Sequence, residues 1–268
     1  MAALMYPAID PVLFEIGPLA VRWYGLSYVA GFIVAAMIFS WLNRRWKVGL
    51  STDDMLTVVL YCVIGVLVGS RIGWVLFYGG SAYLLDPVRI LATWEGGMSW
   101  HGGFLGILAA GWVLSRRLNL SFVTLADMGA VGAPAGFLFG RIANFINGEL
   151  WGRVTDVPWG MVFPGAGPLP RHPSQLYEAG LEGLVMLVVL ALLARNRRPA
   201  GFYFGAFMLL YGTFRALVEL VREPDASLGF VLGPLTMGQV LSLPVALVGA
   251  WFVWRAVSSR MTGGKEES

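Results

Sequence analysis

The chain has 268 residues, of which 57% are hydrophobic and only 13% are charged, and its mean hydropathy is +0.69. This charged share is about half that of an average soluble domain. A soluble enzyme cannot bury so much apolar surface, and the same composition excludes a disordered or fibrous chain. The net charge of +3 is too small and too dispersed to indicate nucleic-acid binding. These values predict an integral membrane protein.

Seven apolar segments approach the roughly 20 residues that a helix needs to cross a bilayer. The N-terminal segment that precedes them carries Asp10 and Glu15 but no basic region. We therefore interpret it as a short extramembrane segment and not as a cleavable signal peptide. The expected fold is all-α, one membrane domain of residues 1–268. Its transmembrane helices are expected at about 18–42, 55–78, 98–115, 122–142, 174–194, 201–221 and 236–256.

Basic residues cluster after the first, third, fifth and seventh expected spans. Because cytoplasmic loops are enriched in Lys and Arg, all four clusters predict one orientation, with the N-terminus outside and the C-terminus in the cytoplasm. The outer loops are then about 79–97, 143–173 and 222–235. The clusters are Arg44, Arg45 and Lys47; Arg116 and Arg117; Arg195, Arg197 and Arg198; and Arg255, Arg260 and Lys265.

Ionisable residues within the expected spans fall at a common depth. A charge in the hydrocarbon costs roughly 2.5–3.5 kcal/mol on insertion scales, so such a residue usually faces a polar interior and has a task. All except Asp127 fall in the outer half of the membrane, which predicts one polar cavity open toward the outer leaflet. The residues at this depth are Arg22, Arg71, His101, Arg141, Glu178, Glu182, Arg215 and Glu219.

Helical spacing places several of these residues on shared faces, because side chains three or four positions apart are neighbours on a helix. Ion pairs that merely lock helices together, such as Arg215 with Glu219, would explain single pairs. They would not explain the common depth of the whole set. The three polar stripes are Tyr211, Arg215, Glu219 and Arg222; Arg141, Asn144 and Gly148; and Gln175, Glu178 and Glu182.

Three segments combine polar residues with glycine or proline near the outer ends of the spans. In the first, WHGG at 100–103, His101 can exchange a proton near neutral pH, although a structural interfacial histidine is the alternative. In the second, GRIANFINGELWG at 140–152, arginine, amides and a glutamate suit a phosphate and glycerol hydroxyls. In the third, RHPSQLYE at 171–178, we expect Ser174 to cap the fifth span and His172 to be structural.

The chain resembles the bacterial prolipoprotein diacylglyceryl transferases over nearly its whole length. The resemblance rests on the segments at 140–152 and 171–178, on HGG after Trp100 and on RWYGLSY at 22–28. It implies seven helices in the bacterial cytoplasmic (inner) membrane, with the active site toward the outer leaflet. It also implies the reaction. Phosphatidylglycerol donates its diacylglyceryl group to the lipobox cysteine of a preprolipoprotein signal peptide, and glycerol-1-phosphate leaves.

This chemistry assigns roles to the candidate residues. A thiol attacks as the thiolate, so His101 is the expected base; activation by arginines that lower the thiol pKa stays open. Arg141 and Arg215 are the expected cations at the departing phosphate. Besides membrane lipids, the expected partners are the two substrates, and without a P-loop, HExxH motif or Cys/His cluster we expect no metal or cofactor. The expected substrate-binding residues are Tyr24, Asn144, Asn147, Glu149, Gly152, Gln175, Glu178, Tyr211 and Glu219.

Three other classes of function fit less well. A transporter should open to both sides and often shows inverted repeats, which the sequence lacks. An intramembrane protease needs paired aspartates or a Ser–His site, whereas Asp127 is the only aspartate at depth and GxSxG is absent. A scaffold would not explain the clustered arginines. The single cysteine, Cys62, lies among apolar residues, where a thiol is usually inert packing.

Overall fold

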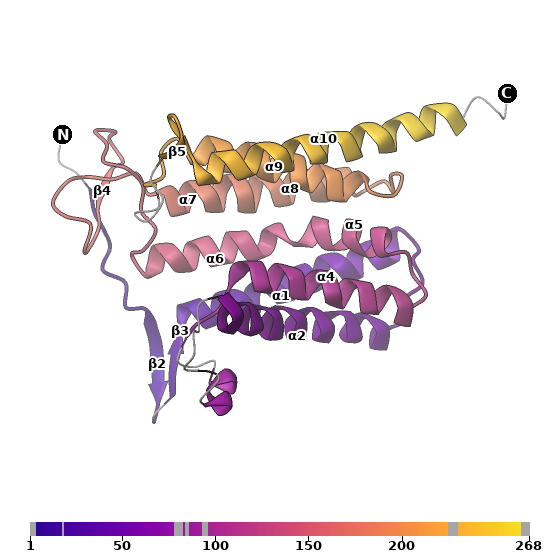
Figure 1. The fold of residues 1–268 in the computed structure, drawn as a ribbon, viewed down its shortest axis with the longest axis horizontal. Helices are drawn as coiled ribbons and strands as arrows, with labels where there is room; N and C mark the ends of the chain where they lie inside the picture. The colour runs from indigo at the N-terminus through magenta and orange to yellow at the C-terminus, as the bar shows by residue number, and fades with distance from the viewer. Residues whose placement is uncertain are drawn as a thin grey trace. The chain divides into compact units, whose positions relative to one another are not determined.

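The computed structural model describes residues 4–17, 19–77, 83, 86–92, 96–224 and 230–263. Parts of the expected outer loops at 79–97 and 222–235 lie outside these residues. The chain divides into two compact units, one of Met1–Lys47 with Asp127–Ser268 and one of Val48–Ala126. Most described residues in both units are helical (Figure 1).

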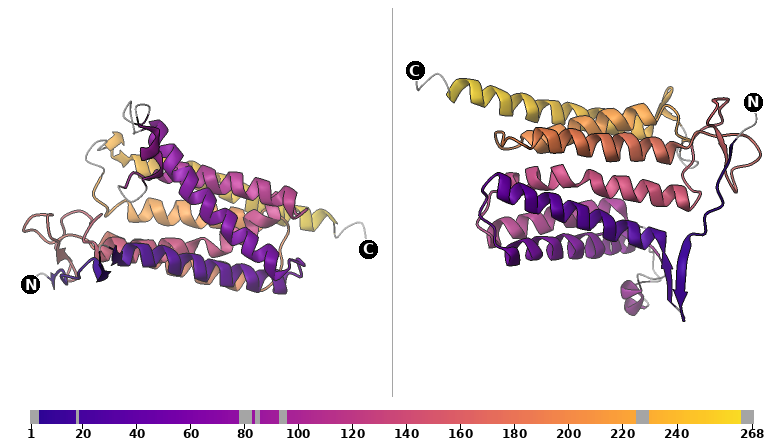
Figure 2. Two further views of the ribbon diagram at one scale, coloured as in Figure 1. Left: turned by 90° about the horizontal axis from the view of Figure 1, so that it is seen from below. Right: turned by 180° about the vertical axis from the view of Figure 1, so that it is seen from behind.

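In the larger unit, long helices run side by side. Helix α6 packs against α1, and α9 packs along α10 (Figures 1 and 2). A π-helical segment, η3, joins α7 to α8 without a break and packs against α6. The helix α5 (Phe122–Gly132) begins in the smaller unit and leads into α6. The bounds are α1 Trp23–Arg45, α6 Pro134–Ile146, α7 Ser174–Glu178, η3 Ala179–Val185, α8 Met186–Leu193, α9 Phe202–Val218 and α10 Met237–Gly263.

The smaller unit is built on two helices, α2 (Thr52–Phe77) and α4 (Trp100–Arg117), with a short 3-10 helix η1 (Pro87–Leu91) between them. Glycines let the two backbones touch. A Cβ on Gly69 would lie 2.4 Å from the carbonyl oxygen of Gly102, and one on Gly106 would lie 1.9 Å from that of Gly65. Small residues at helix contacts are typical of membrane proteins, because close backbone approach replaces the hydrophobic effect as the source of association.

The charge of Arg71, on α2, is satisfied by backbone carbonyl oxygens. Its side chain is buried, and the guanidinium donates to backbone carbonyls of η1 and of the segment that precedes α4. The arginine therefore fastens this connection to α2, which accounts for a charge that the sequence placed in the outer half of the membrane. The acceptors, at 2.5–3.1 Å, are the carbonyl oxygens of Arg89, Ile90, Ala92, Gly96 and Gly97.

Among the residues that the structure describes, five helical stretches are long and apolar enough to cross a membrane. Large apolar side chains such as Leu60 and Leu247 are exposed on them, as a lipid-facing surface requires. The helix at the sixth expected span, α9, is apolar but has 17 residues, and α4, which carries His101, Arg116 and Arg117, is outside this set. A mostly helical, polytopic membrane fold is confirmed, while seven spans and the orientation stay predictions. The five stretches are Trp23–Trp46, Thr52–Phe77, Phe122–Ile146, Ser174–Leu193 and Met237–Ser259.

Short strands add to the expected all-α fold. An antiparallel hairpin of β2 (Val12–Ile16) and β3 (Leu19–Arg22) precedes α1, so the first helix begins at Trp23 and not at residue 18. Arg22, expected within the first span, ends β3 instead. Hydropathy alone cannot distinguish a short apolar strand from the start of a helix, which explains the error. The other pairs are β1 (Leu4–Met5) with β4 (Met161–Val162), in parallel, and β5 (Phe230–Leu232) with β6 (Leu235–Thr236), antiparallel.

Candidate active site

Three arginines converge on the carboxylate of Glu178, at the end of α7. Nε of Arg141 lies 2.5 Å from Oε2, while Nη1 of Arg215 and Nη1 of Arg222 lie 2.9 Å and 2.6 Å from Oε1. The side chain of Glu178 is 1% exposed, whereas those of the three arginines are 15–21% exposed. A buried anion therefore holds three cations that remain partly accessible.

The path of the backbone explains how Glu178 reaches Arg141. Helix α6 starts with Pro134 in its first turn, where the missing N–H of proline costs nothing. A Cβ on Gly183 would lie 2.6 Å from Cα of Leu138, so η3 and α6 approach at backbone distance. The π-helical winding of η3 follows directly after Glu178, and such irregular turns are frequent at functional sites.

Arg215 is held by a second carboxylate as well. Its Nη2 lies 2.8 Å from Oε2 of Glu219, one helical turn further along. Helix α9 ends at Val218, but the backbone N–H groups of Glu219 and Arg222 still donate to carbonyls four residues back, each at 3.0 Å. Arg215 and Glu219 are paired one turn apart, as the spacing predicted, while Arg222 lies in the turn after the helix and reaches Glu178 from there.

Tyr211 lies one turn before Arg215 on the same stripe. Its ring stacks on Phe137 of α6, with the ring centroids 5.2 Å apart, and on Phe207 of its own helix. This aromatic stack fixes α9 against α6. The expected substrate-binding residue Tyr211 therefore also has a packing role beside the arginines.

A chain of amides extends from Arg141 to Glu149. Arg141 Nη1 donates to Oδ1 of Asn144 at 3.3 Å, and Nδ2 of Asn144 donates to Oε1 of Glu149 at 2.8 Å. Nδ2 of Asn147 donates to the same carboxylate oxygen at 3.3 Å, and Nε2 of Gln175 donates to the backbone oxygen of Glu149 at 2.5 Å. Arg141 and Asn144 share one face of α6, as the spacing predicted, but the helix ends at Ile146, so Gly148 does not continue this stripe.

Gly152 occupies a place that no other residue fits. A Cβ there would lie 2.5 Å from the carbonyl oxygen of Val221 and 2.8 Å from Cβ of His172. Its N–H donates to the backbone oxygen of His172 at 2.8 Å, and the residue forms a β-bridge with Arg222. Because Gly152 has no side chain, the backbone at Arg222 can pack directly against it, and Gly152 thereby helps to position Arg222.

The segment at 171–178 makes structural contacts. Nδ1 of His172 lies 3.2 Å from the hydroxyl of Tyr177, which also accepts from Nε1 of Trp159 at 2.6 Å. Burial lowers the pKa of His172 below its usual value. The sequence predicted that Ser174 caps α7, but this prediction is wrong, because the Ser174 hydroxyl donates to the backbone oxygen of Leu150 at 2.9 Å.

Tyr24 lies on α1, which packs against α6. Its hydroxyl is 3.4 Å from that of Tyr28, and the two rings meet edge to face with centroids 5.3 Å apart. Tyr28 in turn lies within electrostatic range of Arg141 and Glu149. The tyrosine pair therefore belongs to the surroundings of the arginine cluster.

His101 belongs to the smaller unit, whereas all three arginines on Glu178 belong to the larger one. It is the second residue of α4 and is exposed. The helix begins at an N-cap, Ser99, whose side chain accepts from the N–H of Gly102 at 3.3 Å. The expected role of His101 as a base stays a prediction.

Asp127 has a structural explanation. Its two carboxylate oxygens accept from the backbone N–H groups of Gly201 and Phe204, each at 2.8 Å. A carboxylate in this position satisfies the free N–H groups at the start of α9 and favours the positive end of the helix dipole. The one aspartate at depth is therefore a helix cap, which leaves no paired-aspartate site among the described residues.

Comparison with known proteins decides the family. The sequence matches the family described as prolipoprotein diacylglyceryl transferase over residues 11–255. The chain belongs to the prolipoprotein diacylglyceryl transferase family. The predicted family is confirmed, and the protein is a membrane-embedded transferase of lipoprotein biosynthesis.

Several bacterial relatives are similar over nearly their whole length, and each is named phosphatidylglycerol–prolipoprotein diacylglyceryl transferase. The one from Geobacter sulfurreducens is 52% identical and aligns over 92% of this chain and 95% of its own. The one from Nitratidesulfovibrio vulgaris is 50% identical over 93% and 95%, and the one from Vibrio cholerae is 49% identical over 94% and 93%.

Two charged residues lie beside this transferase's site that the sequence placed on polar stripes but to which it assigned no catalytic or binding role. Arg222 binds Glu178; it was expected to begin an outer loop, and its spacing from Arg215 was the available signal. Glu182 is completely buried one turn after Glu178, and neither of its carboxylate oxygens has a hydrogen-bond partner in the part of the chain that the structure describes. Its place on the stripe of Gln175 and Glu178 was visible in the sequence.

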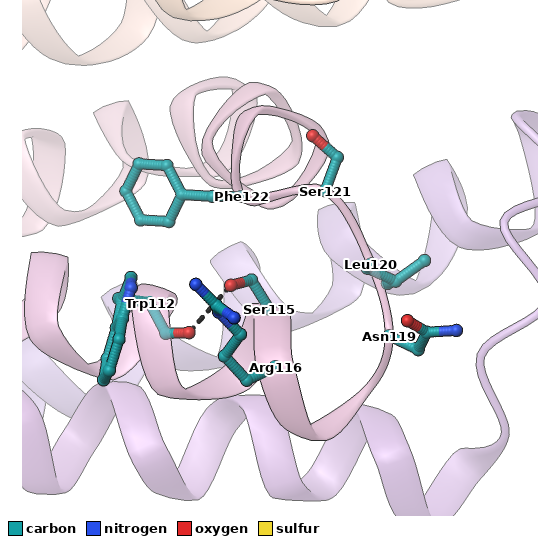
Figure 3. Close-up of a pocket in the computed structure, with 7 residues that line it drawn as sticks. All are labelled: Trp112, Ser115, Arg116, Asn119, Leu120, Ser121 and Phe122. Atoms are coloured by element: carbon teal, nitrogen blue, oxygen red, sulfur yellow. Dashed lines mark hydrogen bonds between the residues drawn. The ribbon is translucent and has the colours of Figure 1, made fainter.

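Two pockets of this family member contain none of these charged residues. One, of about 630 Å³, surrounds the turn between α4 and α5, where the hydroxyl of Ser115 donates to the backbone oxygen of Trp112 (Figure 3). The other, of about 560 Å³, is lined by Arg45 and residues 195–198. The polar cavity expected at the outer leaflet stays a prediction. The first pocket is lined by Trp112, Ser115, Arg116, Asn119, Leu120, Ser121 and Phe122.

Proposed function

We propose that this protein transfers the diacylglyceryl group of phosphatidylglycerol to the lipobox cysteine of a preprolipoprotein. The family and the names of its relatives support both substrates. We place the enzyme in the bacterial cytoplasmic membrane, with about seven spans, the N-terminus outside, the C-terminus in the cytoplasm and the reaction at the outer leaflet. The basic clusters that follow alternate spans support this orientation.

The observation that carries the proposal is the difference in exposure between the carboxylate and the guanidinium groups. Glu178 and Glu219 are 1% and 5% exposed, while Arg141 and Arg215 are 21% and 15% exposed. The carboxylates hold the guanidinium groups in place from the buried side. The accessible N–H edges suit a phosphodiester, which accepts charge-assisted hydrogen bonds from arginine.

The reaction places new charge where these cations are. The cysteine thiolate attacks the glyceryl carbon bonded to the phosphate oxygen, a carbon–sulfur bond forms, and the carbon–oxygen bond breaks. The bonding electrons of that carbon–oxygen bond leave with glycerol-1-phosphate, whose phosphate carries one more negative charge than the diester. Fixed guanidinium groups stabilise this developing charge without reorganising, which lowers the barrier. In this proposal His101 accepts the thiol proton.

The contacts refine the roles expected for the binding residues. Asn144, Asn147 and Glu149 form a hydrogen-bonded set beside Arg141 that suits the glycerol hydroxyls. Glu178 and Glu219 are engaged by arginines, so we assign them to holding the cations and not to contacting lipid. The acyl chains can remain in the bilayer, so the site needs to enclose only the headgroup and the cysteine.

The test uses purified full-length protein in detergent, phosphatidylglycerol labelled in its acyl chains and a lipobox peptide. We expect the peptide to gain the mass of one diacylglyceryl group. The bond that joins the glyceryl group to the cysteine sulfur should resist mild base. A matched peptide with serine in place of the cysteine should gain nothing. Absence of transfer, or release of diacylglycerol without peptide modification, would contradict the proposed reaction.

A further inference from the structure

The carboxylate of Glu219 is enclosed by the start of α10, which was not expected to contribute to the site. Oε2 of Glu219 contacts Nη2 of Arg215 at 2.8 Å, and Oε1 accepts from the hydroxyl of Thr236 at 3.0 Å. Glu219 and Thr236 are both buried. The acceptor that holds Arg215 is therefore itself held by a buried hydroxyl.

Thr236 is fixed by a reciprocal cap at the start of α10. Its N–H donates to Oε1 of Gln239 at 3.2 Å, and the N–H of Gln239 donates to Oγ1 of Thr236 at 3.4 Å. Two free donors at the helix start are satisfied in this way. Because Oγ1 accepts from Gln239, its own hydrogen is directed to Glu219, and the positive end of α10 favours the carboxylate.

Gly238 provides the space that the carboxylate occupies. A Cβ at this position would lie 2.6–2.7 Å from Cδ, Oε1 and Oε2 of Glu219. A larger residue would displace the whole carboxylate group. The side chain of Glu219 thus rests on the backbone of α10, between the guanidinium of Arg215 and the hydroxyl of Thr236.

We propose that Thr236 is a positioning residue of the transfer reaction, acting through Glu219 to set the orientation of the Arg215 guanidinium, with Gly238 providing the space for that carboxylate. The inference rests on the proposed function, in which Arg215 meets the departing phosphate. Thr236 has no contact with the lipid in this scheme. A change at Thr236 should therefore alter the chemical step more than lipid binding, since misdirection of a fixed cation matters most when charge develops.

The test measures kcat and KM for phosphatidylglycerol with a lipobox peptide. Thr236→Val keeps the shape of the side chain but removes the hydroxyl, and we expect kcat to fall about tenfold with KM within about twofold. Thr236→Ser restores the donor and should return kcat to near the wild-type value. Thr213→Val is the matched control, because Thr213 is exposed on α9 and its hydroxyl donates to the backbone oxygen of Leu209 at 2.7 Å.

Two further variants separate positioning from simple capping of α10. Gln239→Ala removes half of the cap but leaves the Thr236 hydroxyl on Glu219, so it should lower thermal stability and leave kcat unchanged. In a Glu219→Gln background, Thr236→Val should cost nothing further, because its effect passes through the carboxylate. Equal losses of kcat in both backgrounds would overturn the inference.

A second variant keeps the test decisive if Thr236→Val does not fold. Gly238→Ala leaves the hydroxyl in place but displaces the carboxylate, and we expect a loss of kcat of the same order. If the wild-type protein forms the thioether, normal kcat in either folded variant overturns this inference but not the proposed function. A wild-type protein that forms no thioether overturns the proposed function itself, and the inference with it.

Discussion

Arg141 and Glu178 form an ion pair with unequal exposure: Nε lies 2.5 Å from Oε2, yet the arginine is 21% exposed and the glutamate 1%. A buried carboxylate retains its charge at acceptable cost only when it is paired. Glu178 therefore depends on its arginines as much as they depend on it for orientation. In this transferase site a buried carboxylate therefore holds the guanidinium groups that surround it in position.

The first prediction concerns Glu178→Gln, which keeps the size of the side chain and removes its charge. Three arginines lose their shared partner, so we expect transfer to fall at least about 100-fold. We also expect a stability loss of about 3–5 kcal/mol, typical of a broken buried pair. The measurements are initial rate and thermal unfolding in detergent.

Glu223→Gln is the matched control for this change. Glu223 is also paired with an arginine, Arg171, at 3.0 Å, but its side chain is 48% exposed. Exposed pairs are worth about 0–1 kcal/mol, so the variant should be close to wild type in stability and rate. Equal effects of the two variants would mean that burial of Glu178 confers no special role.

The second prediction concerns Arg141→Lys. A lysine keeps the positive charge but cannot contact Glu178 and Asn144 at once while presenting further N–H groups. We expect most activity to be lost in a protein that remains folded. Arg116→Lys, at an exposed arginine, should transfer normally. Near-normal transfer by Arg141→Lys would show that a point charge suffices, or that Arg141 is not at the phosphate.

The third prediction concerns pH and His172. Burial lowers the pKa of His172 in the folded protein below its unfolded value of about 6.5, so the unfolded chain binds more protons between the two values. This contribution to stability is complete above about pH 6.5 and is lost as pH falls toward the lowered pKa. The unfolding temperature of the wild type should fall more between pH 7.5 and pH 5.5 than that of His172→Gln. Parallel curves for the two proteins would contradict the assignment.

Helical spacing predicted much of the candidate site. The periodicity of Arg215, Glu219 and Arg222, and that of Arg141 and Asn144, follows from 3.6 residues per turn and needs no knowledge of packing. The identity of each partner could not be predicted in the same way. Glu178 was expected to bind substrate, because the sequence does not show that two other helices bring arginines to it.

Residues at element boundaries were the hardest to predict. Thr236 is the last residue of the two-residue strand β6, directly before α10, and a threonine there has no distinctive signal until Glu219 is brought beside it. Arg22 was placed in a span because the apolar strand β3 has the hydropathy of a helix start. In both cases the partner decided the structure: Glu219 for Thr236, and strand β2 for the strand that ends at Arg22.

The fourth prediction concerns orientation. In a Cys62→Ala background, a single cysteine introduced at the exposed Asn196, among the basic residues, should react with an impermeant maleimide only after the cells are opened. A cysteine introduced at Leu169, which is 55% exposed in the expected outer segment, should react in intact spheroplasts. Labelling at 196 but not at 169 in intact spheroplasts would reverse the proposed orientation.

The last prediction concerns the base. His101→Gln keeps polarity and approximate size, so the protein should fold and transfer slowly at neutral pH if His101 accepts the thiol proton. The lost step is formation of thiolate, so raising the pH toward the free cysteine pKa of about 8.5 should recover part of the rate. Transfer by wild type and variant should be measured across pH 6.5–9, with thermal unfolding at each value to show that both remain folded. A defect that is constant with pH would assign His101 to positioning. Full activity throughout would remove His101 from the mechanism, leaving the arginines on Glu178 to lower the thiol pKa.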